Sequence, residues 1–122
     1  MAFAEYDHYD ATGLAQLVRR GDVSPSELVE EAIARIERHN PKLNAVVYKA
    51  FDEARKTAKG KLPGGPFKGV PFLIKDISMP VKGWPMTNGS AYLRGYVSDA
   101  DGELVRRGDV SPSELVEEAI AR

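Results

Sequence analysis

Residues 70–77 read VPFLIKDI, an apolar run that ends in a lysine and an aspartate and follows the breaker-rich stretch LPGGPFKG at 62–69. The run is continuous instead of alternating, which is typical of a strand covered on both faces by helices. Pro71 fits near its start, where a missing N–H is tolerated. A shorter β-prone segment lies at 44–48. These features predict an α/β fold that is mainly helical, with one or two strands.

Two helices are predicted before these segments. Apolar residues recur at helical spacing from Thr12 to Arg20, and Gly21 is placed to end that helix. Next comes SPSE at 24–27, which has the form of a capping box with proline at the first helical position. It predicts a helix from Pro25 to about His39, ended by Asn40-Pro41.

A third amphipathic helix is predicted at 49–61, between the two β-prone segments. Beyond the second of them, residues 79–97 form a long segment rich in glycine and proline but not of low complexity. Long irregular segments inside compact domains are often functional. Asp101 is placed to cap a further helix through Glu103.

An exact repeat sets the organisation of the chain. The nineteen residues LVRRGDVSPSELVEEAIAR occur at 17–35 and again at 104–122. Stacked repeats diverge at exposed positions, so identity there indicates a recent duplication, a recombination or an engineered sequence. We expect residues 1–107 to be one parent sequence and 108–122 to be a duplicated helix, a copy of 21–35. Either copy presents the same apolar stripe, Leu28, Ala32 and Ile33 or Leu115, Ala119 and Ile120, so exchange of helices between molecules is expected.

Composition excludes several classes of function. The 17 basic and 18 acidic residues are spread along the chain, which disfavours nucleic acid and anionic membranes as partners. No apolar run approaches the roughly 20 residues of a membrane span, and the first residues are acidic, unlike a secretory signal. The chain has no cysteine, which excludes disulfides and thiol catalysis. We expect a cytoplasmic protein.

Lys75 is the main candidate for chemistry. It ends the predicted buried strand, on the same face as Leu73. Apolar surroundings would favour the neutral amine, which can accept a proton from a hydroxyl and so serve as the base of a serine nucleophile. The alternative is a Lys75–Asp76 pair that turns into solvent at the strand end, since lysine is seldom buried.

The sequence around Lys75 resembles a known family. Residues 65–76, GPFKGVPFLIKD, look like the G-P-L-x-G-V-P-x-x-I-K-D stretch of the amidase signature family. Further matching stretches occur in the expected order: SPSELV at 24–29, NPKLNA at 40–45, TNGS at 87–90 and DADGELVRR at 99–107. Within the family, the sequence is most similar to the bacterial amidases that open the lactam rings of nylon oligomers.

The resemblance implies the amino-terminal part of the family's α/β/α fold and the hydrolysis of a carbon–nitrogen amide bond in a small substrate. In that family a serine is the nucleophile, a second serine in a cis peptide relays its proton, and the lysine is the final base. Only Lys75 matches this triad, because the glycine- and serine-rich signature has no counterpart here. We therefore expect this chain to be inactive alone, since nucleophile, relay and base act as a unit.

Other candidates are weaker. Ser78 lies at a spacing that points away from Lys75, and Ser90 follows Asn-Gly and more simply shapes a turn. The glycine-rich stretch 64–69 lacks the Lys-Ser/Thr pair of a phosphate loop. No cofactor or metal is predicted, because His8 and His39 stand alone and the acidic residues 99, 101 and 103 suit a helix start. Two aromatic residues, Trp84 and Tyr92, either line a substrate passage or pack in the interior.

Overall fold

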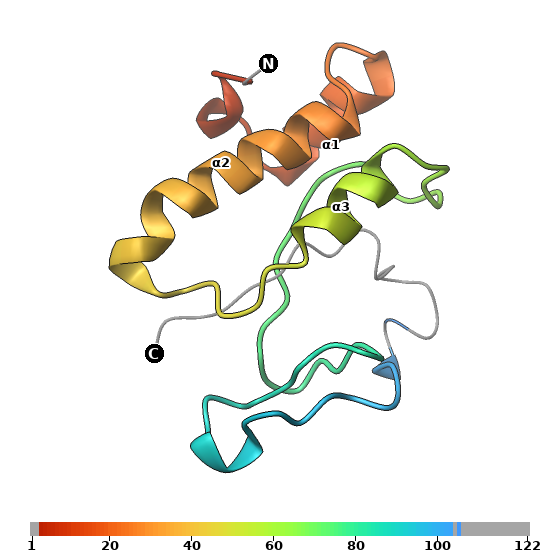
Figure 1. Cartoon of the computed structure of the whole chain (residues 1–122). Coiled ribbons are helices and arrows are strands. Elements are labelled where there is room, and N and C mark those ends of the chain that lie inside the picture. Colours follow the sequence, from red (N-terminus) through yellow and green to blue (C-terminus); the bar gives the residue numbers. More distant parts are fainter. Residues whose placement is uncertain (1–2, 104, 106–122) are drawn as a thin grey trace.

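The computed structural model describes residues 3–103 and 105, where a helical body is followed by a long irregular segment (Figure 1). Its elements are the short 3-10 helix η1 (Tyr6–His8), α1 (Ala11–Arg20), α2 (Pro25–Leu43), α3 (Phe51–Ala58) and the 3-10 helix η2 (Ala91–Leu93). The expected helix at 108–122 and the expected boundary at 107 lie outside the described residues.

Helix α1 forms where the apolar spacing predicts it. The Asp10 side chain accepts a hydrogen bond of 2.8 Å from the backbone N–H of Gly13 and so satisfies one of the free donors of the first turn. At the other end, Gly21 adopts φ 78°, and its N–H bonds to carbonyls of the last turn. The prediction for 12–20, ended by Gly21, is confirmed.

The capping box of α2 is also confirmed. The Ser24 hydroxyl accepts from the N–H of Glu27 at 3.2 Å, while the N–H of Ser24 donates to the Glu27 carboxylate at 2.9 Å. Hydrogen bonds from the backbone N–H and then the hydroxyl of Ser24 lower the pKa of Glu27. Local chemistry alone therefore sets the start of this helix.

The predicted end of α2 is wrong, because the helix continues through Pro41 to Leu43. A proline in the last turn removes only one N–H from the ladder, and the Asn40 carbonyl still accepts from Asn44 at 2.7 Å. The Asn40 side chain also bonds to both backbone groups of Val46, at 2.8 and 2.9 Å. These bonds hold the chain that leaves the helix, which offsets the cost of the proline.

Helix α3 is shorter than the predicted 49–61. It begins after Ala50, which offers no side chain to cap it, and ends at Ala58. Lys49 lies outside it and pairs with Glu37 of α2 at 2.7 Å. In Figure 1, α3 runs back alongside α2, and Arg55 bonds to Glu30 of α2 at 2.8 Å.

Neither predicted strand forms among the described residues. The segment 44–48 is irregular, and 70–77 is irregular apart from a single bridge position at Phe72. Val70 and Ile74 are buried, but Phe72, Leu73 and Ile77 are 36–42% exposed, so the segment is not covered on both faces. A strand needs the N–H and C=O groups of neighbours. A pair of this kind that the structure describes in full, Pro85 with Val97, lies outside both predicted strands.

The interior consists of three hydrophobic clusters. The first joins α1 to the fully buried Leu28 of α2 and to Val70. The second packs Val29 and Ile33 of α2 against Ala54 of α3, so α2 contributes to both clusters. The third lies in the irregular segment and contains Ile74, Val81 and Val105. These apolar contacts fix the position of the irregular segment. They therefore also position the residues that follow Ile74.

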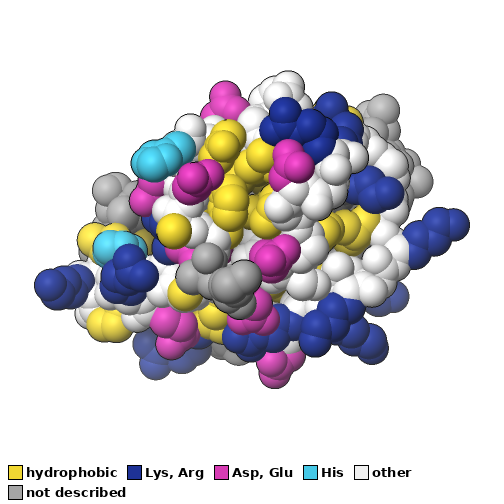
Figure 2. Space-filling model, turned by 90° about the horizontal axis from the view of Figure 1, so that it is seen from above, with side chains coloured by type: hydrophobic (Ala, Val, Ile, Leu, Met, Phe, Trp, Pro, Cys, Tyr) yellow, Lys and Arg dark blue, Asp and Glu magenta, His cyan; other side chains and the backbone are white. Residues whose placement is uncertain are grey.

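Charged side chains of both signs surround a central hydrophobic patch on the face shown in Figure 2. No helix in residues 3–103 and 105 has the length and apolar character needed to cross a membrane.

Candidate functional site

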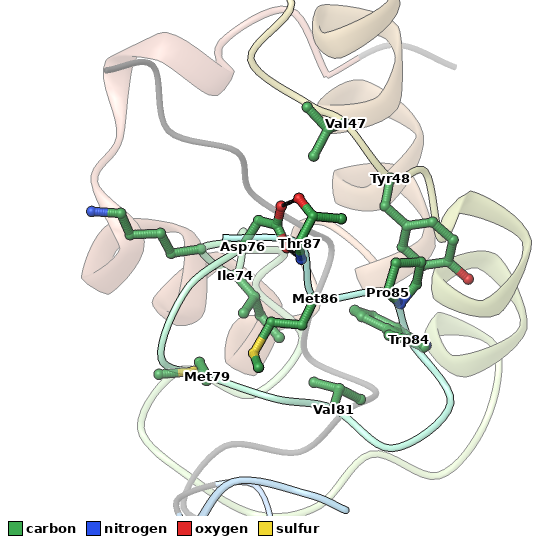
Figure 3. A pocket seen from close by; sticks show the side chains of 11 residues that line it. Val47, Tyr48, Ile74, Asp76, Met79, Val81, Trp84, Pro85, Met86 and Thr87 are labelled. Atoms are coloured by element: carbon green, nitrogen blue, oxygen red, sulfur yellow. Dashed lines mark hydrogen bonds between the residues drawn. The ribbon is translucent and has the colours of Figure 1, made fainter. Parts of the chain in front are cut away.

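A pocket of about 140 Å³ lies next to the main candidate residue. Three segments form it: the connection before α3, the end of the VPFLIKDI stretch, and the irregular segment from Met79 (Figure 3). The lining is mostly apolar, with polar groups on one side, and it comprises Val47, Tyr48, Ile74, Lys75, Asp76, Met79, Val81, Trp84, Pro85, Met86 and Thr87. The sequence did not predict this pocket, because its walls are up to 40 residues apart in the chain.

Lys75 lines the pocket without the apolar surroundings of the first prediction, and for its side chain the alternative, exposure to solvent, agrees with the structure. Its side chain is exposed, and so is that of Leu73, whereas Ile74 between them is buried. The predicted apolar face would have required a paired strand with covered sides, and the described residues do not provide one. Lys75 therefore combines a place in the pocket lining with a solvent-exposed side chain.

Asp76 does not turn into solvent as the alternative prediction had it. One carboxylate oxygen accepts from the N–H of Thr87 at 2.7 Å, the other bonds to the Thr87 hydroxyl, and the Asp76 carbonyl accepts from Asn88 at 3.0 Å. The dashed line in Figure 3 marks this contact. Asn88 and Gly89 have φ of 52° and 69°, which suits these residue types. Through these hydrogen bonds, Asp76 holds the turn of residues 87–90 close to the backbone at Lys75.

An aromatic pair forms another wall of the pocket. The rings of Tyr48 and Trp84 are tilted, with centroids 5.6 Å apart, and the indole N–H donates to Glu53 of α3 at 2.9 Å. Two effects raise the pKa of Tyr48: desolvation, which is the larger, and the negative charge of Glu53. Trp84 therefore both lines the pocket and packs against its neighbours. Tyr92 is 93% exposed and does not line it.

The structure places the remaining candidates outside this pocket. Ser78 is exposed, with φ 66°. The Ser90 side chain accepts from the N–H of Tyr92 at 3.2 Å and caps η2, as expected for a residue that shapes a turn. Asp101 accepts from the N–H of Lys82 at 2.8 Å. Within residues 3–103 and 105, no three histidine, aspartate or glutamate side chains gather as a metal site would require.

Comparison with known proteins decides the family. The sequence profile described as Amidase matches residues 27–108, more than half of the chain. The chain belongs to the amidase family. The matched residues of this family member include Lys75, Asp76 and the whole pocket lining.

Three relatives place the chain more closely within the family. It is 40% identical over 100 residues to the 6-aminohexanoate-cyclic-dimer hydrolase of Pseudomonas sp. (strain NK87), which covers 80% of this chain and 20% of the relative. A structure of 6-aminohexanoate cyclic dimer hydrolase complexed with substrate matches with a TM-score of 0.76 and 36% identity, over 91% of this chain and 23% of that chain. A bacterial aryl acylamidase of the amidase signature family matches with a TM-score of 0.75 and 34% identity, over 91% and 25% of the two chains.

These matches confirm the predicted family and fold class. The chain has the fold of part of the amidase signature enzymes, and this part is mainly helical. It spans about a fifth of the length of the curated relatives.

Proposed function

We propose that this chain is part of a hydrolase of carbon–nitrogen amide bonds, in which Lys75 is the final base of a serine nucleophile. The observation that carries the proposal is the position of Lys75: it lines the pocket, within the residues that match the amidase family. Relatives named for amide hydrolysis support the same reaction.

In the proposed mechanism, a relay serine in a cis peptide takes a proton from the nucleophilic serine and passes its own proton to the Lys75 side chain, the final base. The serine oxygen then bonds to the substrate carbonyl carbon, the carbon–nitrogen bond breaks, and the proton passes to the leaving amine. Water hydrolyses the acyl-serine by the same proton route in reverse. The bonds between Asp76 and Thr87 keep the backbone at Lys75 in place.

We propose further that the 122-residue chain alone does not catalyse this reaction, because only Lys75 matches the triad. The purified chain is expected to release no amine from simple amides above background and to take no label from a serine-directed fluorophosphonate. Turnover or labelling of the chain would contradict the proposed inactivity.

The proposed role in hydrolysis is tested with a chimaera. Residues 27–103 replace the matched segment of the Pseudomonas 6-aminohexanoate-cyclic-dimer hydrolase, which supplies the rest of the enzyme. The chimaera is expected to release amine from amides and to form an acyl-serine. A folded chimaera that neither reacts with the fluorophosphonate nor hydrolyses amides would overturn the proposal.

A second candidate role, self-association through the repeated helix, rests on the environment of the first copy. Leu28, Val29 and Ile33 are at most 6% exposed, and Glu30 bonds to Arg55 at 2.8 Å. The equivalent residues of the second copy are Leu115, Val116, Ile120 and Glu117. The surface formed by α1, α3 and Val70 therefore fits either copy.

The first copy holds this surface more firmly within one molecule. It continues into the last turns of α2, where Asn40 bonds to Val46, and a short turn joins it to α1. Exchange between two molecules is therefore favoured at high protein concentration, when the second copy of one chain replaces the first copy of another.

Light scattering tests this second role. The mass of the full chain is expected to rise with concentration, and Leu115→Asp, which places a charge on the stripe of the second copy, is expected to suppress the rise. Leu43→Asp is the matched control, since Leu43 is 65% exposed and lies outside both copies. A strict monomer at high concentration, or equal behaviour of the two variants, would contradict helix exchange.

A further inference from the structure

We infer that Asn88 is a site of spontaneous deamidation, at which the exposed side-chain amide is converted to isoaspartate or aspartate with water as the only other reactant. The reaction takes place in the turn of residues 87–90 and needs neither the pocket nor the proposed hydrolase activity. Its rate is set by the hydrogen bonds that Asp76 and Thr87 make with this turn.

The reaction needs only an asparagine side chain and the backbone nitrogen of the next residue. The nitrogen of Gly89, once it has lost its proton, attacks the side-chain carbonyl carbon of Asn88. A carbon–nitrogen bond forms, and the bond to the side-chain nitrogen breaks as that nitrogen takes up a proton and leaves as ammonia. Water then opens the cyclic imide at either carbonyl, which gives aspartate or isoaspartate. Glycine favours ring closure because it has no Cβ to crowd the ring.

The chain contains three asparagines, and the structure excludes the first of them. The side-chain amide of Asn40 is held on both sides, because it donates to the carbonyl of Val46 at 2.9 Å and accepts from the N–H of the same residue at 2.8 Å. Pro41 follows and has no N–H. The nitrogen of a proline cannot lose a proton and attack, so Asn40 cannot form the ring.

The other two asparagines share a backbone conformation but differ in the residue that follows. Asn44 and Asn88 have φ of 47° and 52°, both in the left-handed region, and both residues are exposed. Ala45 carries a Cβ that crowds the ring, whereas Gly89 does not. A Cβ added at Gly89 would meet nothing within 4 Å, so neighbouring atoms do not obstruct this peptide unit. Asn44 is therefore an internal control for Asn88.

The hydrogen bonds of the turn oppose ring closure. The N–H of Gly89 donates to the Thr87 hydroxyl at 3.3 Å, and this bond is lost when the Gly89 nitrogen gives up its proton. The Thr87 hydroxyl is itself bonded to the Asp76 carboxylate (Figure 3). In addition, the N–H of Asn88 donates to the Asp76 carbonyl at 3.0 Å. The folded turn therefore slows the reaction, and loosening it should speed the reaction.

Isoaspartate would change the turn more than aspartate. It places an extra methylene in the main chain between the Cα of residue 88 and the nitrogen of Gly89. The bonds from the N–H groups of Gly89 and Ser90 back to Thr87, at 3.3 and 2.9 Å, then lose their geometry. Because Thr87 lines the pocket, deamidation alters one of the pocket walls.

Peptide mass spectrometry of the full 122-residue chain, incubated at mildly alkaline pH, tests the site. Trypsin cuts after Lys49 and Lys82, so Asn44 and Asn88 fall in different peptides. Asn88 is expected to deamidate about tenfold faster than Asn44 or more, which corresponds to a barrier lower by about 1.4 kcal/mol. Its product is expected to accept methyl groups from an isoaspartate methyltransferase. Equal rates at the two asparagines, or an unchanged Asn88, would overturn the inference.

Two variants separate the chemistry of the site from the control of its rate. Gly89→Ala keeps the asparagine but adds a Cβ, and is expected to slow deamidation of Asn88 about tenfold. Thr87→Val keeps the shape of the side chain but removes the hydroxyl, and is expected to speed deamidation about fivefold. Thr12→Val is the matched control, since Thr12 is exposed in α1 and should leave the rate unchanged.

The outcomes of these variants are distinct. An unchanged rate in Gly89→Ala would contradict ring closure through the Gly89 nitrogen, and equal rates in Thr87→Val and Thr12→Val would contradict control by the turn. The comparison of Asn88 with Asn44 within one molecule stands even if a variant fails to fold.

Discussion

Lys75→Met in the chimaera should lower the rate of amide hydrolysis at least about 10³-fold, because removal of one member of a serine catalytic unit has effects of this order or larger. Methionine has a similar length but accepts no proton, so the nucleophilic serine stays protonated. The measurement is the rate of amine release at saturating amide, together with the rate of fluorophosphonate labelling.

Two controls sharpen this prediction. Lys68→Met removes a lysine from the same matched segment, but Lys68 is exposed and does not line the pocket, so activity should stay within a few-fold. Lys75→Arg keeps the positive charge, yet a guanidinium does not give up its proton in proteins, so this variant should be as inactive as Lys75→Met. Full activity of Lys75→Arg would show that the charge, and not proton transfer, is what matters at this position.

Gly69→Ala should destabilise the chain by about 2–4 kcal/mol, the largest effect we expect from a small substitution. Gly69 adopts φ 83°, which is unfavourable for alanine, and an added Cβ would lie 2.8 Å from Cγ of Pro25 and 3.0 Å from Cγ1 of Val18. The first contact is with the start of α2 and the second with α1. The substitution should therefore push the segment before Val70 away from the helices, as measured by urea unfolding followed by circular dichroism.

Gly64→Ala is the matched control for this prediction. It lies in the same breaker-rich stretch, but its added Cβ would meet nothing within 4 Å, and its φ is not positive. Its stability should stay within about 0.5 kcal/mol of the original chain or rise slightly, because alanine restricts the unfolded chain. Similar unfolding midpoints for the two variants would show that the close approach at Gly69 is not essential.

Predictions based on local chemistry were the ones that the structure confirmed. The capping box at Ser24 and Glu27 and the glycine at 21 define helix ends through bonds between residues at most four apart. The end of α2 was predicted wrongly because it does not depend on neighbouring residues alone. The hydrogen bonds from Asn40 to Val46 form only after the chain has turned. Proline identity alone therefore gave the wrong end of α2.

The candidate site was predicted only in part. Lys75 was singled out from its family motif, and the structure places it on a pocket. No local pattern indicated that Asp76 would bind Thr87 or that Tyr48 would face Trp84, since these contacts join residues 11 and 36 positions apart. The apolar run at 70–77 indicated burial but did not show which of its residues would find partners.

The amino-acid sequence by itself determined the family, the end of α1 and the start of α2, because a motif and a cap depend on residues that are neighbours in the chain. Only the tertiary structure decided that the VPFLIKDI segment is half exposed, that α2 continues past its proline, and that a pocket forms beside Lys75. These features depend on which distant segments supply hydrogen bonds and apolar contacts, and neither residue type nor spacing carries that information.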